Sequence, residues 1–558
     1  MLHLDNISIA FKSDAGFQAV INNVSFKIST NEILGVVGES GSGKSVTALA
    51  IAGLLPKGIS KITQGTIHFE ETSLLDKSEK EWERLRGNDI AMIFQEPMSA
   101  LNPSMSCGKQ VQEILRLHLE LSQKAAKAET LQLFDKVKLP RPEAIFNSYP
   151  HQISGGQMQR VMIAMAIACK PKLLIADEPT TALDVTVQKE IIQLLKDIQK
   201  ETKMSILFIS HDLSLVSEIA QRVIVMHKGS VVEEGSAEDI FKNPKELYTK
   251  ALIASKPDAD TTLKRLPTVS DFVNDTVPTQ TLSVEEKLQK RNLLHSQKPL
   301  LEVINVEKTY YSNAGLFQKP HKVKAVNDVS FKVYEGETLG LVGESGCGKS
   351  TLGNVILQLQ NVTTGQVFYR GQDITKLSKT DLRKLRKEIQ LIFQDPFSSL
   401  NPRLTVGQAI QEPMKVHKLY NSDLERKTKV LELLERVGLQ AEHYYRYPHE
   451  FSGGQRQRIG IARTIGLQPK LIICDESVSA LDISVQAQVL NLLNELKEDF
   501  GFTYIFISHD LSVVKYMADE LIVMNKGKIE EQGDPEAVYK NPQKAYTKRL
   551  IAAIPKGI

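Results

Sequence analysis

The sequence contains one long series of motifs twice, in the same order. GVVGESGSGKS at 35–45 recurs as GLVGESGCGKS at 340–350, and YPHQISGGQMQR at 149–160 recurs as YPHEFSGGQRQR at 447–458. The chain has 558 residues, and one hydrophobic core rarely grows beyond roughly 250–300 residues, so at least two domains are expected. The repeat therefore predicts that the second domain is a copy of the first.

The distance between matching residues locates the variable parts of the repeat. Lys349 follows Lys44 by 305 positions, whereas His509 follows His211 by 298, so the copies differ in length between the lysine and the later motifs. Such a difference is typical of one fold with a variable surface loop. Residues 257–298 have no counterpart, and their polar composition with scattered Pro and Thr indicates a linker. Its end, SVEEKLQKRNLL, could form a short helix.

Composition excludes several other classes of protein. The chain is 42% hydrophobic and 24% charged with a formal net charge of +3, which excludes a disordered chain and argues against a protein that mainly coats nucleic acid. The N-terminus lacks the features of a signal peptide, and no uncharged apolar run reaches about 18 residues, so we expect no bilayer span. The cysteines form no C-x-x-C pair. We therefore expect no disulfide framework, zinc module or iron–sulfur centre, and a reducing cytosol is the favoured setting. The cysteines are Cys107, Cys169, Cys347 and Cys474.

Hydrophobic patterning predicts an α/β fold in each half. The apolar runs at 33–37 and 173–176 are typical of strands buried on both faces, as in a parallel sheet. The amphipathic stretch VQKEIIQLLKDIQKET is typical of a helix that covers such a sheet. The segments 96–153 and 395–451 are helix-like, and each is long enough for a separate helical subdomain.

A glycine-rich segment follows an apolar run in each half and matches the phosphate-loop pattern. Its glycines let backbone N–H groups turn toward phosphates, and the helix that it opens adds the positive end of its dipole. The lysine would neutralise charge on the β- and γ-phosphates, and the serine after it would ligate Mg²⁺. A chance glycine-rich turn is the alternative, but the pattern occurs twice. The residues are Gly38, Glu39, Ser40, Gly41, Ser42, Gly43, Lys44 and Ser45, and Gly343, Glu344, Ser345, Gly346, Cys347, Gly348, Lys349 and Ser350.

An Asp-Glu pair closes a later apolar run in each half. Asp177 and Glu178 follow LLIA, and Asp475 and Glu476 follow LIIC. Parallel sheets place their ligands at the carboxyl ends of strands. The first acid suits Mg²⁺, directly or through a water, and the second can polarise an attacking water. The alternative is a strand-end acid that caps the next helix, and a phosphate loop upstream in both halves argues against it.

A histidine and a glutamine also follow apolar runs in each half. His211 and His509 follow FIS, where a histidine can donate a hydrogen bond to a γ-phosphate oxygen. Gln95 and Gln394 follow MIF and LIF and could sense water and Mg²⁺. A lone strand-end histidine is usually a satisfied surface group, and the glutamines alone mean little. The repetition in register therefore carries this prediction.

The segments ISGGQ and FSGGQ predict a loop that leads into a helix, with the serine as its cap and glycines that expose backbone N–H groups. This is a further anion site in a half that already has a phosphate loop. The economical interpretation is that it serves the nucleotide of the other half, and an ordinary serine-capped helix start is the alternative. The residues are Ser154, Gly155, Gly156 and Gln157, and Ser452, Gly453, Gly454 and Gln455.

In this order, the motifs resemble those of an ABC-transporter ATPase. The order occurs twice and covers nearly the whole chain. The resemblance implies an α/β fold of two tandem P-loop NTPase domains. Each would have a parallel-sheet core, an antiparallel β subdomain and a helical subdomain. We therefore expect domains at 1–256 and 299–558, joined by the linker 257–298, with a similar tail at the end of each domain.

The resemblance also implies roles for single residues. The two phosphate loops, Gln95, Gln394 and the two SGGQ signatures would bind ATP. Asp184 and Asp482 would belong to loops at the seam between the halves, and Tyr310, and less surely Phe11, lies where the family stacks an aromatic ring on adenine. The catalytic residues would be Glu178, Glu476, His211 and His509. The ligands of Mg²⁺ would be Ser45, Gln95, Asp177, Ser350, Gln394 and Asp475.

A narrower resemblance is to the ATPases of dipeptide and oligopeptide importers, in particular the fused double subunits of microcin C-type peptide importers. It rests on FQEPMSALNP, FQDPFSSLNP, GESGCGKSTLG, ESVSALD and the tail pattern NP-x₃-YTK-x-LIA. Tails of that group usually read His-Pro-Tyr, but here they read Glu-Leu-Tyr and Lys-Ala-Tyr, and the signatures begin with Ile153 and Phe451 rather than Leu. The cysteine cluster that many relatives carry near the tail is missing, so no iron–sulfur cluster is expected.

The resemblance implies an ATP-hydrolysing subunit that energises a membrane importer, most simply for dipeptides or oligopeptides. The halves would face each other head to tail, so that each phosphate loop meets the other half's signature and two competent ATP sites form. The expected partners are two integral-membrane permease subunits, docked on the helical subdomains, and indirectly an extracytoplasmic substrate-binding protein, with no nucleic acid. The expected location is the cytoplasmic face of the bacterial inner membrane.

Two other functions compete with this hypothesis. A twin ATPase that acts on ribosomes or DNA would carry a long charged helical linker or zinc-binding cysteine pairs, and neither is present. A regulatory ATPase that only binds nucleotide is disfavoured by the two Asp-Glu pairs and the two histidines. The cargo is not readable, so peptides, glutathione, nickel chelates and a peptide antibiotic stay open. Cys347, inside the second phosphate loop, predicts that thiol reagents block ATP binding there and that ATP protects.

Overall fold

The computed structural model describes residues 1–13, 16–181, 183–257, 263–311, 322–395, 399–479 and 481–555. These residues form two compact units, Met1–Ile253 and Ala254–Ile554. Residues 258–262 of the expected linker and 396–398 of the second expected helical subdomain lie outside the described residues.

The first unit contains two β-sheets. Its strands are β1 (Leu2–Ser13), β2 (Gly16–Ile28), β3 (Ile33–Val37), β4 (Ser60–Phe69), β5 (Thr72–Ser73), β6 (Ile90–Ile93), β7 (Leu173–Asp177), β8 (Ser205–Ile209), β9 (Arg222–His227) and β10 (Ser230–Ser236). The six-stranded sheet has the order β10-β9-β3-β8-β7-β6, and all its neighbours are parallel except β10 on β9. The other sheet, β2-β1-β4-β5, is antiparallel throughout.

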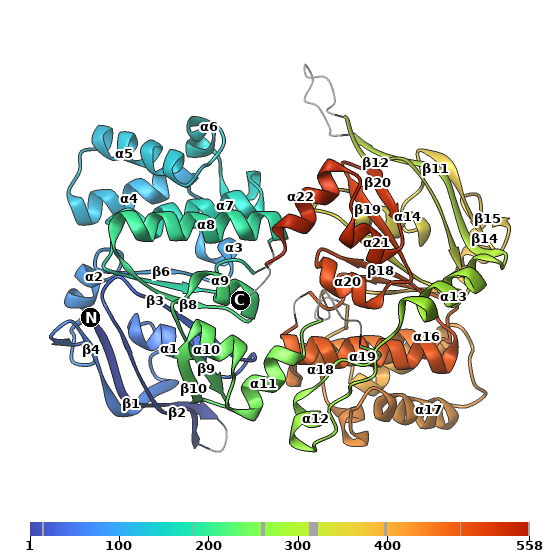
Figure 1. The fold of residues 1–558 in the computed structure, drawn as a ribbon, viewed down its shortest axis with the longest axis horizontal. Helices are drawn as coiled ribbons and strands as arrows, with labels where there is room; N and C mark the ends of the chain where they lie inside the picture. Colours follow the sequence, from blue (N-terminus) through green and yellow to red (C-terminus); the bar gives the residue numbers. More distant parts are fainter. Residues whose placement is uncertain are drawn as a thin grey trace. The chain divides into compact units, whose positions relative to one another are not determined.

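Helices connect most of the strands of the first unit. They are α1 (Lys44–Ile51), α2 (Glu79–Leu85), α3 (Pro97–Ala100), α4 (Cys107–Leu119), α5 (Gln123–Lys136), α6 (Pro142–Asn147), α7 (Gly155–Ile167), α8 (Val185–Thr202), α9 (Leu213–Ile219), α10 (Ala237–Lys242) and α11 (Leu247–Ala254). Helices α4–α6 lie at one end of the unit, and the antiparallel sheet lies at the other (Figure 1). Ala48 and Ile51 of α1 share one core with Leu4 of β1 and Ile175 of β7, so α1 packs between the two sheets.

The second unit repeats both sheets. Its strands are β11 (Pro299–Tyr311), β12 (Lys322–Tyr334), β13 (Thr338–Val342), β14 (Thr364–Tyr369), β15 (Gln372–Asp373), β16 (Ile389–Ile392), β17 (Leu471–Asp475), β18 (Thr503–Ser508), β19 (Glu520–Asn525) and β20 (Lys528–Gly533). The six-stranded sheet has the order β16-β17-β18-β13-β19-β20, with only β20 antiparallel to its neighbour. The antiparallel sheet has the order β12-β11-β14-β15.

The helices of the second unit follow the same plan, preceded by two that the repeat does not contain. They are α12 (Val269–Val273), α13 (Val284–His295), α14 (Lys349–Ile356), α15 (Lys379–Glu388), α16 (Val406–Val416), α17 (Asp423–Arg436), α18 (Gly453–Ile465), α19 (Ile483–Phe500), α20 (Leu511–Met517), α21 (Pro535–Lys540) and α22 (Ala545–Ala553). Helix α13 confirms the short helix expected at SVEEKLQKRNLL.

The predicted fold class is confirmed in both units, which have a parallel-sheet core, an antiparallel sheet and a group of helices. Every residue of β3 and of β7 is buried, as their continuous apolar runs predicted. Helix α8 covers the predicted amphipathic stretch, and its apolar face is buried. Among the described residues, every helix is too short or too polar to cross a bilayer.

The segment between the two copies of the repeat packs on the second unit. Leu266 is buried in the core of that unit, together with residues of α16 and α19. Its N–H donates to Asn491 Oδ1 at 2.9 Å, and its carbonyl oxygen accepts a hydrogen bond from Asn491 Nδ2 at 2.8 Å. Two backbone hydrogen bonds to one buried side chain hold this part of the segment to α19.

Helix α13 meets acidic side chains next to the amino ends of β13 and β19. The pairs are Lys290 Nζ with Asp519 Oδ1 (2.7 Å), Arg291 Nη2 with Glu520 Oε2 (2.5 Å) and His295 Nε2 with Glu337 Oε1 (3.5 Å). The side chains of Glu337 and Glu520 are almost fully buried and that of Asp519 is 15% exposed, whereas the basic side chains of α13 are partly exposed. Helix α13 therefore places basic side chains beside acids that lie largely inside the second unit.

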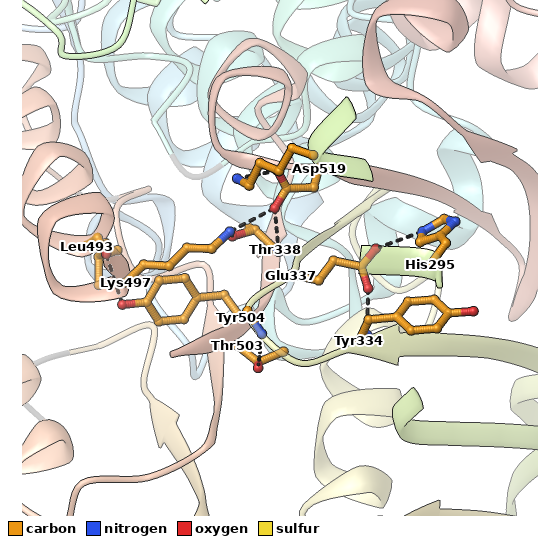
Figure 2. A network of polar contacts seen from close by, with 11 residues as sticks. His295, Tyr334, Glu337, Thr338, Leu493, Lys497, Thr503, Tyr504 and Asp519 are labelled. Carbon is orange, nitrogen blue, oxygen red and sulfur yellow. Dashed lines mark hydrogen bonds and ion pairs between the residues drawn. The ribbon is translucent and has the colours of Figure 1, made fainter. Parts of the chain in front are cut away.

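A buried lysine completes this acidic cluster from within the unit. Lys497 of α19 donates to Asp519 Oδ2 at 2.8 Å and to Thr338 Oγ1 at 2.6 Å (Figure 2). Burial alone would raise the pKa of Asp519, but the charges of Lys497 and Lys290 outweigh it and lower that pKa to about 2. Burial raises the pKa of Glu337 and of Glu520. Within this cluster, the charged form of Asp519 is stabilised by two lysines, whereas burial disfavours the charged forms of Glu337 and Glu520.

Candidate nucleotide site

Each phosphate loop follows the carboxyl end of an inner strand of its parallel sheet. In the first unit, Lys44 is almost fully buried, and its Nζ donates to the carbonyl oxygens of Gly38 and Glu39, both at 2.8 Å. In the second unit, Lys349 donates to the carbonyl oxygen of Gly343 at 2.6 Å. No side chain of the described residues caps α1 or α14, so their first backbone N–H groups can receive an anion.

The glycines of the loop are required by its backbone. Gly38 has φ 150°, and a Cβ atom there would lie 2.2 Å from the carbonyl oxygen of Met226. Gly43 has φ 101°, and its Cβ would lie 2.2 Å from Ile21 Cδ1. The buried hydroxyl of Ser42 has no hydrogen-bond partner among the described residues. A close turn, uncapped N–H groups and a spare hydroxyl together fit a phosphate group.

Glu178 is held by side chains from three other segments of the first unit. Its Oε2 accepts hydrogen bonds from Gln95 Nε2 at 3.0 Å and Thr181 Oγ1 at 2.9 Å, and it lies 3.1 Å from His211 Nδ1. Burial raises the pKa of Glu178, but His211 and Thr181 outweigh it and lower the pKa overall. Glu178 also has φ 48°, a left-handed conformation that is uncommon for this residue. The carboxylate is therefore fixed and ionised.

Asp177, the neighbour of Glu178, has the opposite environment. It ends β7, and its Oδ1 accepts a hydrogen bond from Ser45 Oγ at 3.1 Å. Burial raises the pKa of Asp177 to about 6, against the lowering effect of Ser45 and Lys44. A serine hydroxyl and a carboxylate in contact are oxygen ligands of the kind that Mg²⁺ prefers, and a bound cation would remove this burial penalty.

The second unit has the same contacts with one difference. They are Ser350 Oγ with Asp475 Oδ1 (2.9 Å), Gln394 Nε2 with Glu476 Oε2 (2.9 Å) and His509 Nδ1 with Glu476 Oε2 (3.5 Å). The pKa of Asp475 is raised by burial, and that of Glu476 is lowered by His509 and Lys349 against burial. Ser479, which matches Thr181, donates to the backbone carbonyl of Glu476 instead of its carboxylate. Among the described residues, Glu476 therefore has one hydrogen-bond donor fewer than Glu178.

Each SGGQ signature opens a helix that packs with the helical group. Ser154 caps α7, and the Ser154 N–H donates a hydrogen bond to Gln157 Oε1 at 3.0 Å, so the expected capping is present. Ser452 and Gln455 form the same box at α18. Ser154 and Ser452 are exposed, so both helix ends are open to a ligand.

The remaining predicted residues lie on the edges of their units. Tyr310 of β11 is 40% exposed, and its hydroxyl donates to Gln360. Phe11, its counterpart on β1, is half-buried against the core between the two sheets, which makes it the less available of the two rings. Asp184 and Asp482 occupy the N-cap positions of α8 and α19.

Sequence reasoning missed two kinds of contact at these sites. Thr181 was not singled out, although it binds the carboxylate of Glu178. Tyr248 and Tyr546, in the tails, contact the phosphate loops. The signal for the tyrosines was present, since YTK occurs at the same place in both tails, but a repeated tyrosine does not reveal its partner.

Comparisons with known families agree with this geometry. The model of the family described as ABC transporter matches residues 21–181 and 326–479, one stretch in each unit. The model described as Oligopeptide/dipeptide transporter, C-terminal region matches residues 232–279. Both stretches of the first match contain a phosphate loop and an Asp-Glu pair.

Similar proteins match over the whole chain. The glutathione import ATP-binding protein of Escherichia coli K12 is 46% identical over 566 residues, which covers 100% of this chain and 89% of that protein. The protein of the same description from Salmonella typhimurium is 45% identical with the same coverage. A solved dimer of an ATP-binding cassette with ADP and Pi aligns with 42% of this chain and 98% of its own, at 30% identity and a TM-score of 0.38. Because the family model matches both units and such relatives extend over the full length, the chain belongs to the ABC transporter family and is an ATPase with two tandem domains.

Proposed function

We propose that this chain hydrolyses ATP to drive a membrane importer for small peptides. The observation that carries the proposal is the duplicated site, in which one acid contacts the phosphate-loop serine and the next contacts a glutamine and a histidine. The match of residues 232–279 to an oligopeptide/dipeptide transporter region supports a peptide cargo. Glutathione, the cargo in the names of the two relatives, is itself a small peptide.

Each residue of the site has a defined task in this proposal. Lys44 leaves the loop carbonyls on which it rests and binds the β- and γ-phosphates of ATP. Glu178 stays ionised because its pKa is lowered, so it can accept a hydrogen bond from the attacking water and orient it. His211, held on the Glu178 carboxylate, donates to the γ-phosphate. Lys349, Glu476 and His509 do the same in the second site.

Bound Mg²⁺ would neutralise charge on the β- and γ-phosphates. The residues that would hold it are Ser45, Gln95 and Asp177 in the first unit, and Ser350, Gln394 and Asp475 in the second. The raised pKa of Asp177 and of Asp475 supports this assignment, because a buried acid without a cation is the group that a cation stabilises most.

We also propose that each ATP site is completed by the other domain, with domains at 1–256 and 299–558 and a linker at 257–298. The signature at 154–157 would serve the phosphate loop at 343–350, and the signature at 452–455 would serve the loop at 38–45. A Cβ atom at Gly155 or Gly453 would meet nothing within 4 Å, so the backbone there is open to a phosphate. Tyr310 would stack on the adenine of one nucleotide.

Exposed apolar side chains beside the glutamines support docking of membrane subunits. Leu117 of α4 is 70% exposed, and Phe94 precedes Gln95 with its ring exposed. In the second unit, exposed Phe393 and Val416 line a groove between β16 and α16. Apolar patches of this kind mark interaction sites. We infer one permease subunit at each helical group, an extracytoplasmic substrate-binding protein that delivers the cargo, and a place at the cytoplasmic face of the bacterial inner membrane.

The test replaces each catalytic carboxylate by its amide. Glu178→Gln and Glu476→Gln should each lower ATP turnover at least about 100-fold while ATP still binds, because water activation is lost. Glu83→Gln on α2, an exposed glutamate, is the control and should keep full turnover. If one amide variant keeps full turnover while the other loses all of it, the proposal of two equivalent ATP sites is wrong.

A thiol probe tests nucleotide binding at the second loop alone. Cys347 is buried in that loop, 3.8 Å from Lys349 Nζ. Modification of Cys347 should block ATP binding at this site, and ATP added first should protect the thiol. Labelling that ATP does not slow would contradict nucleotide binding at residues 343–350.

Uptake measurements test the cargo. Cells that carry the chain with its permeases and binding protein should accumulate labelled dipeptides or tripeptides, and Glu178→Gln should abolish the accumulation. Uptake of nickel chelates without peptide uptake would contradict a peptide importer.

A further inference from the structure

The tail helix of each unit contacts the phosphate loop of the same unit through one tyrosine. The hydroxyl oxygen of Tyr248, on α11, accepts a hydrogen bond from the backbone N–H of Glu39 at 3.2 Å. The hydroxyl oxygen of Tyr546, on α22, accepts one from the N–H of Glu344 at 3.1 Å. Both tyrosines are largely buried, at 8% and 6% exposure. The same contact thus forms in both copies, although the residues before the tyrosine differ.

The tail helices are anchored to their sheets independently of the tyrosines. Glu233 of β10 accepts hydrogen bonds from the N–H groups of Lys245 at 2.8 Å and Glu246 at 3.2 Å, just before α11. The ring of Tyr248 also stacks on His227 of β9, with ring centroids 4.0 Å apart. In the second unit, Glu531 of β20 accepts from the N–H groups of Gln543 (2.8 Å) and Lys544 (3.2 Å). Bonds to a carboxylate are strong, so the tail is a fixed support from which the tyrosine reaches the loop.

The residue whose N–H the tyrosine binds also positions the phosphate-binding lysine, through its carbonyl oxygen. The carbonyl oxygen of Glu39 accepts hydrogen bonds from Lys44 Nζ at 2.8 Å and from the N–H of Ser42 at 3.1 Å. In the second unit, the Glu344 carbonyl accepts from Lys349 Nζ (3.1 Å) and the Cys347 N–H (3.2 Å). Tyr248 and Tyr546 therefore hold Glu39 and Glu344, whose carbonyl oxygens bind the lysine and a backbone N–H of the same loop.

We propose that Tyr248 and Tyr546 are positioning residues for the phosphate loops, so that each tail sets the nucleotide affinity of its own unit. They act through the backbone of Glu39 and Glu344 and touch no phosphate themselves. The proposal rests on nucleotide binding at these loops. Because the tether orders the loop before ATP arrives and is the same in the ground and transition states, its loss changes binding rather than the chemical step.

The first test is the pair of single variants Tyr248→Phe and Tyr546→Phe in the full chain. Each keeps the buried ring and removes only the hydroxyl. Each should raise the KM for ATP about 3- to 10-fold, the effect of one hydrogen bond, and change kcat less than about twofold. The double variant should show the two effects together.

Tyr504→Phe is the matched control. Its hydroxyl donates to the carbonyl oxygen of Leu493 at 3.0 Å (Figure 2). This contact lies near the amino end of β18, whereas the phosphate loops follow the carboxyl ends of β3 and β13. This variant loses a buried tyrosine hydrogen bond of the same kind, so it should lower the thermal stability without moving KM. An equal rise in KM in Tyr504→Phe would show a merely structural effect and overturn the proposal.

Cys347 gives a readout that needs neither nucleotide nor hydrolysis. It lies in the second loop, three residues after Glu344, and is buried at 6% exposure. Tyr546→Phe should speed its modification by a thiol reagent several-fold, measured as the mass of the Cys347 peptide, and Tyr248→Phe should leave the rate unchanged. A faster rate supports the tether even if ATP turnover is absent. An unchanged rate together with an unchanged KM overturns it.

Discussion

The two units carry nearly the same residues at the carboxyl edge of their parallel sheets and differently charged ones at the amino edge. In the first unit, Arg222 of β9 pairs with Glu32 at 2.9 Å and with Glu234 of β10, so the unit neutralises its own acids. In the second unit, Glu520 stands where the first has Arg222, and the guanidinium comes from Arg291 of α13. The edge at which we propose that nucleotide binds is thus nearly the same in the two copies, whereas the other edge differs.

The divergence gives the segment before β11 a structural task. Gln221 of the first unit, which accepts a hydrogen bond from the Ile33 N–H at 2.6 Å, is matched by Asp519, which accepts one from the Thr338 N–H at 2.9 Å. An amide needs no counter-charge, but a buried carboxylate does. Asp519 obtains it from Lys497 and from α13. The segment is therefore part of the fold of the second unit and not only a connection.

The largest effect should follow removal of the buried acid. Asp519→Ala leaves Lys497 buried without its partner, so the free energy of unfolding of the second unit should fall by about 3–5 kcal/mol. Gln221→Ala removes one neutral hydrogen bond and should cost the first unit only about 1 kcal/mol. Hydrogen exchange read peptide by peptide resolves the two units. Equal losses would mean that the two edges are equivalent.

Acid should weaken the second unit in a defined range. The pKa of Asp519 is about 2 in the folded chain, below the ordinary aspartate value of 3.8, so its stabilisation is present above pH 4 and is lost as the pH falls toward 2. The difference corresponds to roughly 2.5 kcal/mol. Glu337 and Glu520 have raised pKa values, so their protonation on acidification is stabilising and has the opposite sign.

The variant Asp519→Asn isolates that contribution. Its unfolding free energy should fall less between pH 4 and 2 than that of the parent chain, by the contribution of Asp519, when both are followed by denaturant titration at each pH. The first unit, with Gln221 at the matching position, is the internal reference, and Trp82 reports on that unit alone because it is the single tryptophan. If the unfolding free energy of Asp519→Asn depends on pH in the same way as that of the parent chain, Asp519 is not the source of the acid-induced loss.

A smaller loss should follow removal of either guanidinium. Arg291→Ala leaves the buried Glu520 short of a cation and should cost the second unit about 1–3 kcal/mol. Arg222→Ala should cost the first unit a similar amount. Lys298→Ala, at an exposed position after α13, is the control and should cost almost nothing. If Arg291→Ala behaves like Lys298→Ala in hydrogen exchange, α13 is only a connection.

The smallest predicted effect concerns the hydrogen bond between Thr181 and the Glu178 carboxylate, which the second unit lacks among its described residues. Thr181→Ala removes a donor to the Glu178 carboxylate, so the pKa of Glu178 should rise and the acid limb of the pH–rate profile should move up by roughly half a unit to one unit. Ser479→Ala should leave the profile unchanged, because Ser479 binds a backbone carbonyl. A shift in both variants would show that the two serine or threonine positions act alike.

Most of the fold and the contacts of the candidate site follow from local patterns. The buried strands β3 and β7 are continuous apolar runs, and Asp177, Glu178 and His211 follow strands that are parallel neighbours. Parallel pairing brings the carboxyl ends of such strands together, so a list of strand-end residues already predicts that they meet. What the pattern could not predict is the strength of each contact, such as the extra donor on Glu178.

Local sequence patterns are enough to predict the duplication, the fold class and the composition of both phosphate loops, because each depends on neighbours in the chain or on strand periodicity. The contacts of the tails and of the segment before β11 become visible only in the packed structure. Tyr248 meets Glu39 across 209 positions, and Lys290 meets Asp519 across 229. A polar side chain at such a distance has no periodicity to mark its partner, and only the packing that buries it selects the group that satisfies it.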